Sequence, residues 1–183
     1  MRKVIFFLLL FRVMPFMNAQ SDLNISKKAD SLEQVVASMA ESKEKVDNML
    51  LLAEAYRTKN APLLRKYADE ALILAQKLNY SKGIAKSKLT IGLHYRMQSN
   101  YDKALEYYFD ALKTLQALKE EKDIATAYNY IATVYFRQGT SSDEPKAFQK
   151  AIEYFTQSLE LLEKLEDLPA VVEAENMLSA VYL

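Results

Sequence analysis

The chain has 183 residues, with 24 basic and 24 acidic side chains, one histidine and no cysteine. These counts exclude disulfides, thiolate nucleophiles and zinc–thiolate sites, and a formal net charge of zero gives no sign of a nucleic-acid partner. Half of the residues are apolar and only three are glycine, a composition typical of a folded helical protein.

Residues 1–19 have the pattern of a secretory signal peptide. Arg2 and Lys3 provide a basic start, residues 4–11 form an unbroken apolar run, and Ala19 provides a small residue for cleavage. The run is too short to span a bilayer as a helix. We expect the protein to be exported to the periplasm or another extracytoplasmic space; the alternative is an uncleaved apolar N-terminal helix.

Cleavage after Ala19 would also change the charge of the chain. It removes Arg2, Lys3 and Arg12 and no acidic residue, which leaves a net charge of −3. This mildly acidic mature chain again argues against a nucleic-acid partner. The absence of cysteine excludes a lipoprotein anchor.

Residues 20–43 predict a linker followed by a capping helix. Residues 21–26 are polar, whereas residues 27–39 place Leu32, Val35, Val36 and Met39 on one face of a short helix. We expect this helix to cover the apolar face at the open end of the helices that follow.

Two pairs of antiparallel helices come next. The first pair covers residues 44–59 and 63–78, and Pro62 lies in the turn between them. Residues 81–118 predict the second pair, with a polar turn at 98–100. In this pair small or apolar residues recur every three or four positions, at Leu89, Gly92, Tyr95, Ala104, Tyr108, Ala111 and Leu115.

The same pattern returns along the chain. A large residue, a small residue and a tyrosine three positions later recur at Leu52-Ala53-Tyr56, Ile91-Gly92-Tyr95, Ile131-Ala132-Tyr135 and Leu178-Ser179-Tyr182. On the second helices, Ala71, Ala111 and Ser158 are equivalent, which gives spacings of 40 and then 47 residues. Self-similarity at such a period predicts a stack of helical repeats.

At these residues the chain resembles a tetratricopeptide repeat protein. The resemblance covers residues 44–183, although the family's closing proline is missing from every repeat. It implies an all-α fold in which antiparallel helix–turn–helix repeats stack as a right-handed α-solenoid of about three and a half repeats. The implied repeats are 44–80, 81–120, 121–167 and a partial repeat at 168–183.

The third repeat predicts helices over residues 121–138 and 146–165, separated by an extended loop at 139–145. A further helix follows at 170–183, and its residues Met177, Leu178, Val181 and Tyr182 form an apolar face. No second helix follows to cover this face, so we expect a fragment of a longer protein. The alternative is a final helix that packs on the second helix of the third repeat.

No group of residues indicates catalysis. His94 lies between Leu93 and Tyr95, without a second histidine, a cysteine or a motif for a nucleophile. The sequence therefore predicts a noncatalytic protein without a metal or cofactor. The tyrosines and phenylalanines recur at helical spacing with few basic residues between them, which favours core packing over a platform for nucleic-acid bases.

The tetratricopeptide resemblance implies a concave groove on the first helices that holds a peptide or a partner helix. The groove positions are Leu89, Leu93, Arg96 and Met97 in the second repeat and Thr126, Asn129, Thr133, Phe136 and Arg137 in the third. Leu93 and Thr133 stand where relatives that clamp a C-terminal carboxylate place asparagine, so we do not predict that clamp. The alternative is that these side chains are exposed and bind nothing.

The leading hypothesis is therefore an exported scaffold that binds a protein or peptide, in the form of an amphipathic helix or an extended segment. A second hypothesis rests on another resemblance. The signal-like start, the capping helix and the repeats are similar to the N-terminal sensory region of bacterial signalling proteins. Their membrane helix and output domain, a histidine kinase or a DNA-binding regulator, would lie beyond Leu183. A hydrolase built on this scaffold has no supporting group of residues.

Overall fold

The computed structural model describes residues 29–142 and 144–182, and these residues form helices joined by short turns. The helices are α2 (Lys43–Ala55), α3 (Ala61–Lys77), α4 (Ser81–Met97), α5 (Tyr101–Leu118), α6 (Glu121–Ser142), α7 (Pro145–Lys164) and α8 (Leu168–Val181). A further helix covers residues 29–38. The described part of the chain contains no strand. None of its helices has the length and apolarity needed to cross a membrane.

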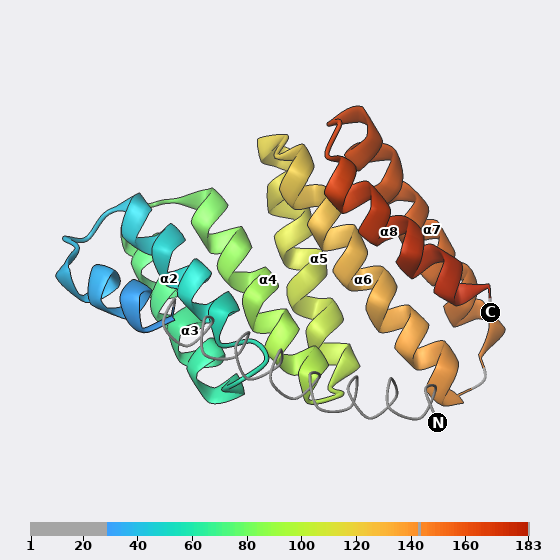
Figure 1. Cartoon of the computed structure of the whole chain (residues 1–183), viewed down its shortest axis with the longest axis horizontal. Helices are drawn as coiled ribbons and strands as arrows, with labels where there is room; N and C mark the ends of the chain where they lie inside the picture. Colours follow the sequence, from blue (N-terminus) through green and yellow to red (C-terminus); the bar gives the residue numbers. More distant parts are fainter. Residues whose placement is uncertain (1–28, 143, 183) are drawn as a thin grey trace, which may run out of the picture.

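Consecutive helices are antiparallel neighbours, so the chain forms the pairs α2–α3, α4–α5 and α6–α7, followed by α8. The first helices of successive pairs also contact each other, α2 with α4 and α4 with α6. They thus form one layer of the stack. Figure 1 shows the helices following one another across the molecule in chain order.

Side-chain caps begin several of these helices. The side chains of Ser42, Asn60, Asn100 and Asp167 each accept a hydrogen bond from the backbone N–H three residues later. Each bond satisfies one of the amide groups that have no partner within the helix. These short polar residues therefore fix the position at which α2, α3, α5 and α8 each begin.

The junctions after α3, α4, α5 and α7 share a second feature. Each contains one left-handed residue, Asn79, Ser99, Lys119 or Glu166, with φ between 50° and 58°. This conformation commonly ends helices and is usually occupied by glycine, because a Cβ atom strains it. None of the four residues is glycine.

The α4–α5 pair is held together by the contact between Gly92 and Tyr108. A Cβ atom on Gly92 would lie 2.5 Å from Cε1 of Tyr108 and 3.2 Å from the backbone oxygen of Ala104. Tyr108 itself is fully buried. The small residues of the sequence pattern therefore lie where a large ring fills the space between two helix backbones.

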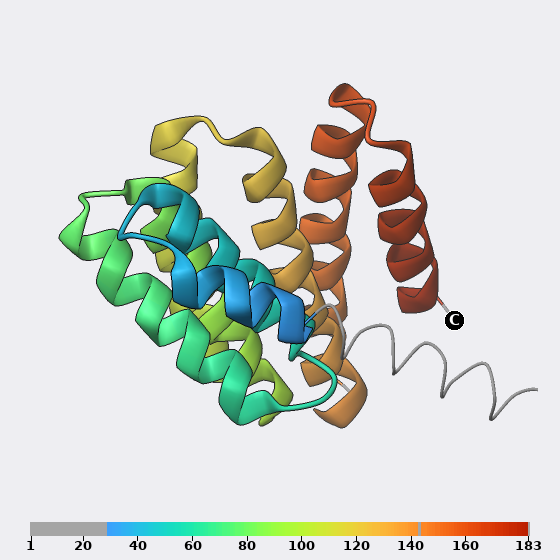
Figure 2. The same ribbon diagram turned by 60° about the vertical axis from the view of Figure 1, so that its left-hand side comes forward.

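The helix over residues 29–38 packs on the first pair, as Figure 1 and Figure 2 show from two sides. Ala29 and Val36 are buried in one cluster with residues of α2 and α3, and the hydroxyl of Tyr67 donates to Glu33. Val35 is 44% exposed, so its predicted place on the buried face was wrong. The predicted start of this helix at residue 27 lies outside the described residues.

The predicted loop at residues 139–145 is mostly helix, because α6 continues to Ser142. Gly139 is buried and packs against the ring of Phe148 in α7. The hydroxyls of Thr140 and Ser141 donate to backbone carbonyls three residues earlier. These contacts stabilise helical backbone in a sequence whose local composition favours a loop.

The last helix, α8, packs against α7. Leu178 and Val181 are partly buried against the cluster of Ala132, Ala151 and Phe155, whereas Met177 is 41% exposed and Tyr182 is 69% exposed. The prediction of one uncovered apolar face was therefore wrong for Leu178 and Val181. The observed packing matches the alternative arrangement, in which α8 lies on α7, the second helix of the third repeat.

Candidate partner-binding groove

The layer formed by α2, α4 and α6 contains a hollow of about 520 Å³, here called the central hollow. It is lined by Asp47, Leu50, Leu51, Glu54, Lys86, Leu89, Thr90, Lys122, Asp123, Thr126 and Tyr130. All three first helices contribute to it, so it exists only when successive repeats stack.

Leu51 is the most exposed apolar residue of the central hollow. Its side chain is 59% exposed, whereas Leu50 and Leu89 beside it are 6% and 5% exposed. An exposed leucine that lines a concave surface marks a place where a partner can bury apolar area. Tyr130 adds an aromatic ring to the same surface, and burial raises the pKa of its hydroxyl.

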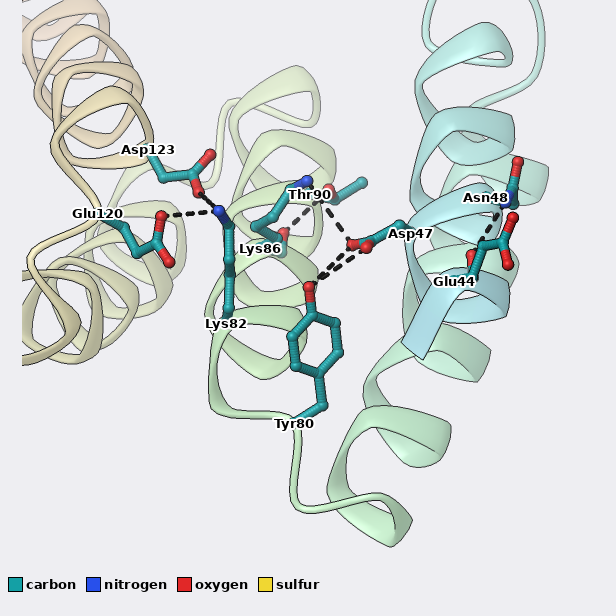
Figure 3. Close-up of polar contacts among 9 residues, drawn as sticks. All are labelled: Glu44, Asp47, Asn48, Tyr80, Lys82, Lys86, Thr90, Glu120 and Asp123. Carbon is teal, nitrogen blue, oxygen red and sulfur yellow. Dashed lines mark hydrogen bonds and ion pairs between the residues drawn. The ribbon is translucent and has the colours of Figure 1, made fainter. Parts of the chain in front are cut away.

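Charges at the N-terminal ends of these helices are paired across neighbouring repeats (Figure 3). Lys82 of α4 lies 2.7 Å from Glu120 and 3.5 Å from Asp123, and the hydrogen bond that Lys82 donates to Glu120 raises the pKa of Lys82. Asp47 of α2 accepts a hydrogen bond from the hydroxyl of Tyr80 at 3.2 Å and lies 3.8 Å from Lys86. At this end of the groove, two lysines are therefore paired with three carboxylates, and neither lysine is left without a partner.

A second hollow of about 320 Å³ lies at the opposite ends of α4 and α6. It is lined by Arg96, Met97, Ser99, Tyr101 and Arg137, and is called the arginine hollow below. The guanidinium of Arg96 stacks over the ring of Tyr130, 5.8 Å from its centroid. Since Tyr130 also lines the central hollow, the two hollows are neighbours.

The predicted groove residues separate into several groups. Leu89 and Thr126 line the central hollow, and Arg96, Met97 and Arg137 line the arginine hollow. Leu93 is 1% exposed and belongs to the N-terminal core cluster, so placing it on the accessible groove was wrong.

The remaining three predicted residues, Asn129, Thr133 and Phe136, lie on α6 between Thr126 and Arg137. The hydroxyl of Thr133 donates to the backbone carbonyl of Asn129, whose side-chain oxygen is buried without a hydrogen-bond partner among the described residues. The ring of Phe136 packs edge-on against Phe148, with centroids 6.1 Å apart. Phe136 therefore belongs mainly to the α6–α7 contact.

The sequence analysis missed the contribution of α2, because it assigned groove positions only to the second and third repeats. Asp47, Leu50, Leu51 and Glu54 all line the central hollow. One signal was present in the sequence. Leu51 is apolar but lies outside the face formed by Met49, Leu52 and Ala53, and an apolar residue off the buried face is a candidate contact for a partner.

The side chain of His94, on α4, is buried and lines neither hollow. It is 9% exposed, and burial together with nearby Arg65 lowers its pKa. Its Nδ1 atom has no hydrogen-bond partner among the described residues. In the described part of the chain, no three histidine, cysteine, aspartate or glutamate side chains are grouped so that they could hold a metal ion.

Comparison with solved structures places this architecture among known folds. A Rap protein complexed with competence and sporulation factor superposes with a TM-score of 0.76 at 21% identity, over 91% of this chain. The apo form of RapI superposes with a TM-score of 0.65 at 19% identity, over 93% of this chain. Two structures of TPR-like repeats of a putative kinesin light chain from Podosopora anserina superpose with TM-scores of 0.60 and 0.59 at 16% identity, over 90% of this chain and 81% of those chains. The chain has a tetratricopeptide-like fold.

The predicted fold class, antiparallel helix pairs stacked as an α-solenoid, is thereby confirmed. The chain spans 46% of the Rap protein and 60% of RapI, or about half the length of these neighbours. No protein-family model and no curated protein matches the sequence. At identities this low the similarity concerns the fold, so the site must be interpreted from its own residues.

Proposed function

We propose that this chain is a noncatalytic scaffold that binds a peptide or a helix of a partner protein along the first helices of its repeats. The observation that carries the proposal is Leu51, 59% exposed and lining a hollow that three first helices build together. A partner side chain placed on Leu51 would bury apolar surface. Burial of a mostly exposed leucine contributes on the order of 1–2 kcal/mol.

The surroundings of Leu51 suit an elongated partner. Lys86, Lys122, Asp47, Glu54 and Asp123 place charges of both signs around the apolar floor. Such a surface fits an amphipathic helix or an extended segment with apolar side chains on one side and polar side chains at its edges. The solved Rap protein, of the same fold, is complexed with competence and sporulation factor, which supports a partner-binding role for this architecture.

A displayed library of short random peptides tests the proposal. We expect the wild-type protein to select binding peptides, and Leu51→Asp to weaken their binding at least about tenfold. Because Leu51 is mostly exposed, this substitution should change the free energy of unfolding by no more than about 0.5 kcal/mol.

Ile73→Asp is the matched control. Ile73 is 66% exposed but lies on α3, a second helix. It should leave binding of the selected peptides unchanged. Failure of the wild-type protein to select any peptide, or an equal effect of Ile73→Asp, would overturn the proposal.

Export and participation in signalling are separate proposals. Residues 1–19 lie outside the described residues, and export rests on their sequence pattern alone. Mass spectrometry of the protein recovered from the extracytoplasmic fraction should give an N-terminus at Gln20; an intact Met1 there would contradict cleavage. The sensory-region hypothesis stays a prediction, and the nucleotide sequence downstream of the Leu183 codon tests it.

A further inference from the structure

The arginine hollow differs in charge from the rest of the groove. Arg96 and Arg137 line it together with Met97, Ser99 and Tyr101, and none of its lining residues is acidic. At the other end of the same helices, Lys82 and Lys86 each lie within ion-pair distance of a carboxylate. Among the described residues, neither Arg96 nor Arg137 forms an ion pair with a carboxylate. Arg96 acts at longer range on Glu54 of the central hollow: burial raises the pKa of Glu54, and the charges of Arg57 and Arg96 partly offset this rise.

The guanidinium of Arg96 is held in place before any partner arrives. It stacks over Tyr130 at 5.8 Å, and its Nε atom is buried without a hydrogen-bond partner in the described part of the chain. A buried N–H group of a charged side chain is costly to leave unpaired. This buried atom faces the core, where the charge of Arg96 also acts on the hydroxyl of Tyr108. Arg96 lines the hollow as well, and there its other N–H groups can bind a carboxylate through two parallel hydrogen bonds.

Arg137 provides the second positive charge. It lies near the C-terminal end of α6 and is exposed. Two guanidinium groups around a hollow of about 320 Å³ leave space for one carboxylate side chain and bound water. Ser99 and Tyr101 line the same hollow, and both are residues with a hydroxyl group that can donate a neutral hydrogen bond.

The distance between the two hollows limits what can occupy both. Leu89 of the central hollow and Arg96 of the arginine hollow lie two turns apart on α4, which places them about 10 Å apart along the helix axis. An extended segment covers this distance in about three residues. A helical segment lying parallel to α4 covers it in about seven residues.

We infer that the arginine hollow binds an aspartate or glutamate side chain of the partner segment whose apolar side chain lies in the central hollow. This inference rests on the proposed function and adds the chemical class of the partner, an acidic amphipathic segment. The geometry favours an acidic side chain over a C-terminal carboxylate, because a segment that lies along α4 passes both hollows without ending at either of them.

Selection of displayed random peptides, fused so that they have no free C-terminal carboxylate, tests this inference. Among peptides that bind the wild-type protein, we expect enrichment of aspartate or glutamate about three or about seven residues from an apolar residue. A selected peptide, synthesised with an amidated C-terminus, should bind the variant Arg96→Gln/Arg137→Gln at least about tenfold more weakly. Exchange of its acidic residue for the corresponding amide should cause a similar loss.

Two further variants show whether weaker binding comes from lost charge in the arginine hollow, from altered folding or from a change in the net charge of the protein. Arg137→Gln alone changes an exposed residue, so it tests the site without disturbing the stacking of Arg96 on Tyr130. Lys113→Gln/Lys146→Gln removes two positive charges from exposed positions on α5 and α7, outside both hollows. It should leave binding of the selected peptides unchanged.

The possible results are distinct. Selected peptides without acidic enrichment, or equal binding to Arg96→Gln/Arg137→Gln, overturn the inference but leave the groove proposal standing. Failure to select any peptide overturns the proposed function and the inference with it.

Discussion

Helices α4 and α8 are both first helices of a repeat, but they are buried to different extents. α4 buries Gly83, Ala85, Ser87, Leu89, Ile91, Gly92, Leu93 and His94, whereas α8 buries only Ala174. α4 has neighbours on several sides, because it contacts α2, α3, α5 and α6, while α8 contacts α7. In a stack of repeats, burial of a residue therefore depends on neighbouring repeats as much as on the pattern of its own helix.

Removal of the Tyr108 ring, which packs against the heavily buried helix α4, should lower the stability of the protein more than any other substitution described below. Tyr108 is 0% exposed, fills the space beside Gly92 and lies 5.4 Å from the ring of Tyr130. We expect Tyr108→Ala to lower the free energy of unfolding by about 3–5 kcal/mol, measured by urea denaturation. The cause is the cavity left between α4, α5 and α6.

Tyr108→Phe is the control for this substitution. The hydroxyl of Tyr108 is buried without a hydrogen-bond partner among the described residues, so its removal should leave stability unchanged or raise it slightly. A loss of several kcal/mol in Tyr108→Phe would show that the hydroxyl, and not the ring, provides the stabilisation.

Enlargement of Gly92 is expected to have the next largest effect. Even the first carbon of a side chain would lie 2.5 Å from Tyr108, so Gly92→Val must force α4 and α5 apart. The expected loss is about 1–3 kcal/mol or more, measured by thermal or urea unfolding. In a Tyr108→Ala background the ring is absent, and the effect of Gly92→Val should shrink. Additive effects of the two substitutions would contradict their direct contact.

A smaller effect should appear in the pH dependence of stability. Burial and nearby Arg65 lower the pKa of His94 below its ordinary value of 6.5. Near pH 6 the imidazole of His94 therefore binds a proton more readily in the unfolded chain than in the folded protein. The free energy of unfolding should fall as the pH drops below about 6.5. His94→Gln should weaken this dependence between about pH 7 and pH 6. Parallel pH profiles of the two proteins would contradict a buried neutral histidine.

The smallest effect is expected on α8. Val172 is 55% exposed, and Val172→Lys should change the free energy of unfolding by no more than about 0.5 kcal/mol in urea denaturation. Ala174→Leu on the same helix is the contrasting variant, because Ala174 is fully buried and a larger side chain there must displace neighbours. Equal effects at the two positions would remove the distinction between the two faces of α8.

Most helix pairs could be predicted from the sequence, because small residues recur where backbones approach. Ala71 and Ala111 are both fully buried, and so is Ser158, which takes the place of alanine in the third repeat. The hydroxyl of Ser158 donates to the backbone oxygen of Ala125 at 2.9 Å, and this bond satisfies a polar group in the core. The sequence pattern could show the equivalence of these positions but not this bond.

The accessible residues of the groove were harder to predict. Leu93 follows Gly92 directly, and its burial depends on contacts with α2 and α3 that no single-helix pattern contains. The extension of α6 to Ser142 depends likewise on Phe148 in the next helix. In both cases contacts between helices override local composition, which is the usual limit of sequence patterns.

The left-handed residues at the junctions have a consequence for engineering this protein. In a residue with a Cβ atom this conformation costs about 1–2 kcal/mol of strain, which glycine avoids. Glycine also makes the unfolded chain more flexible, and this effect offsets part of the stability gained by the substitution. Lys119 and Glu166 occupy such positions and line neither hollow. At the junctions after α5 and α7, substitution by glycine should therefore raise the melting temperature without altering the core or the groove. Ser99 lines the arginine hollow and should be kept.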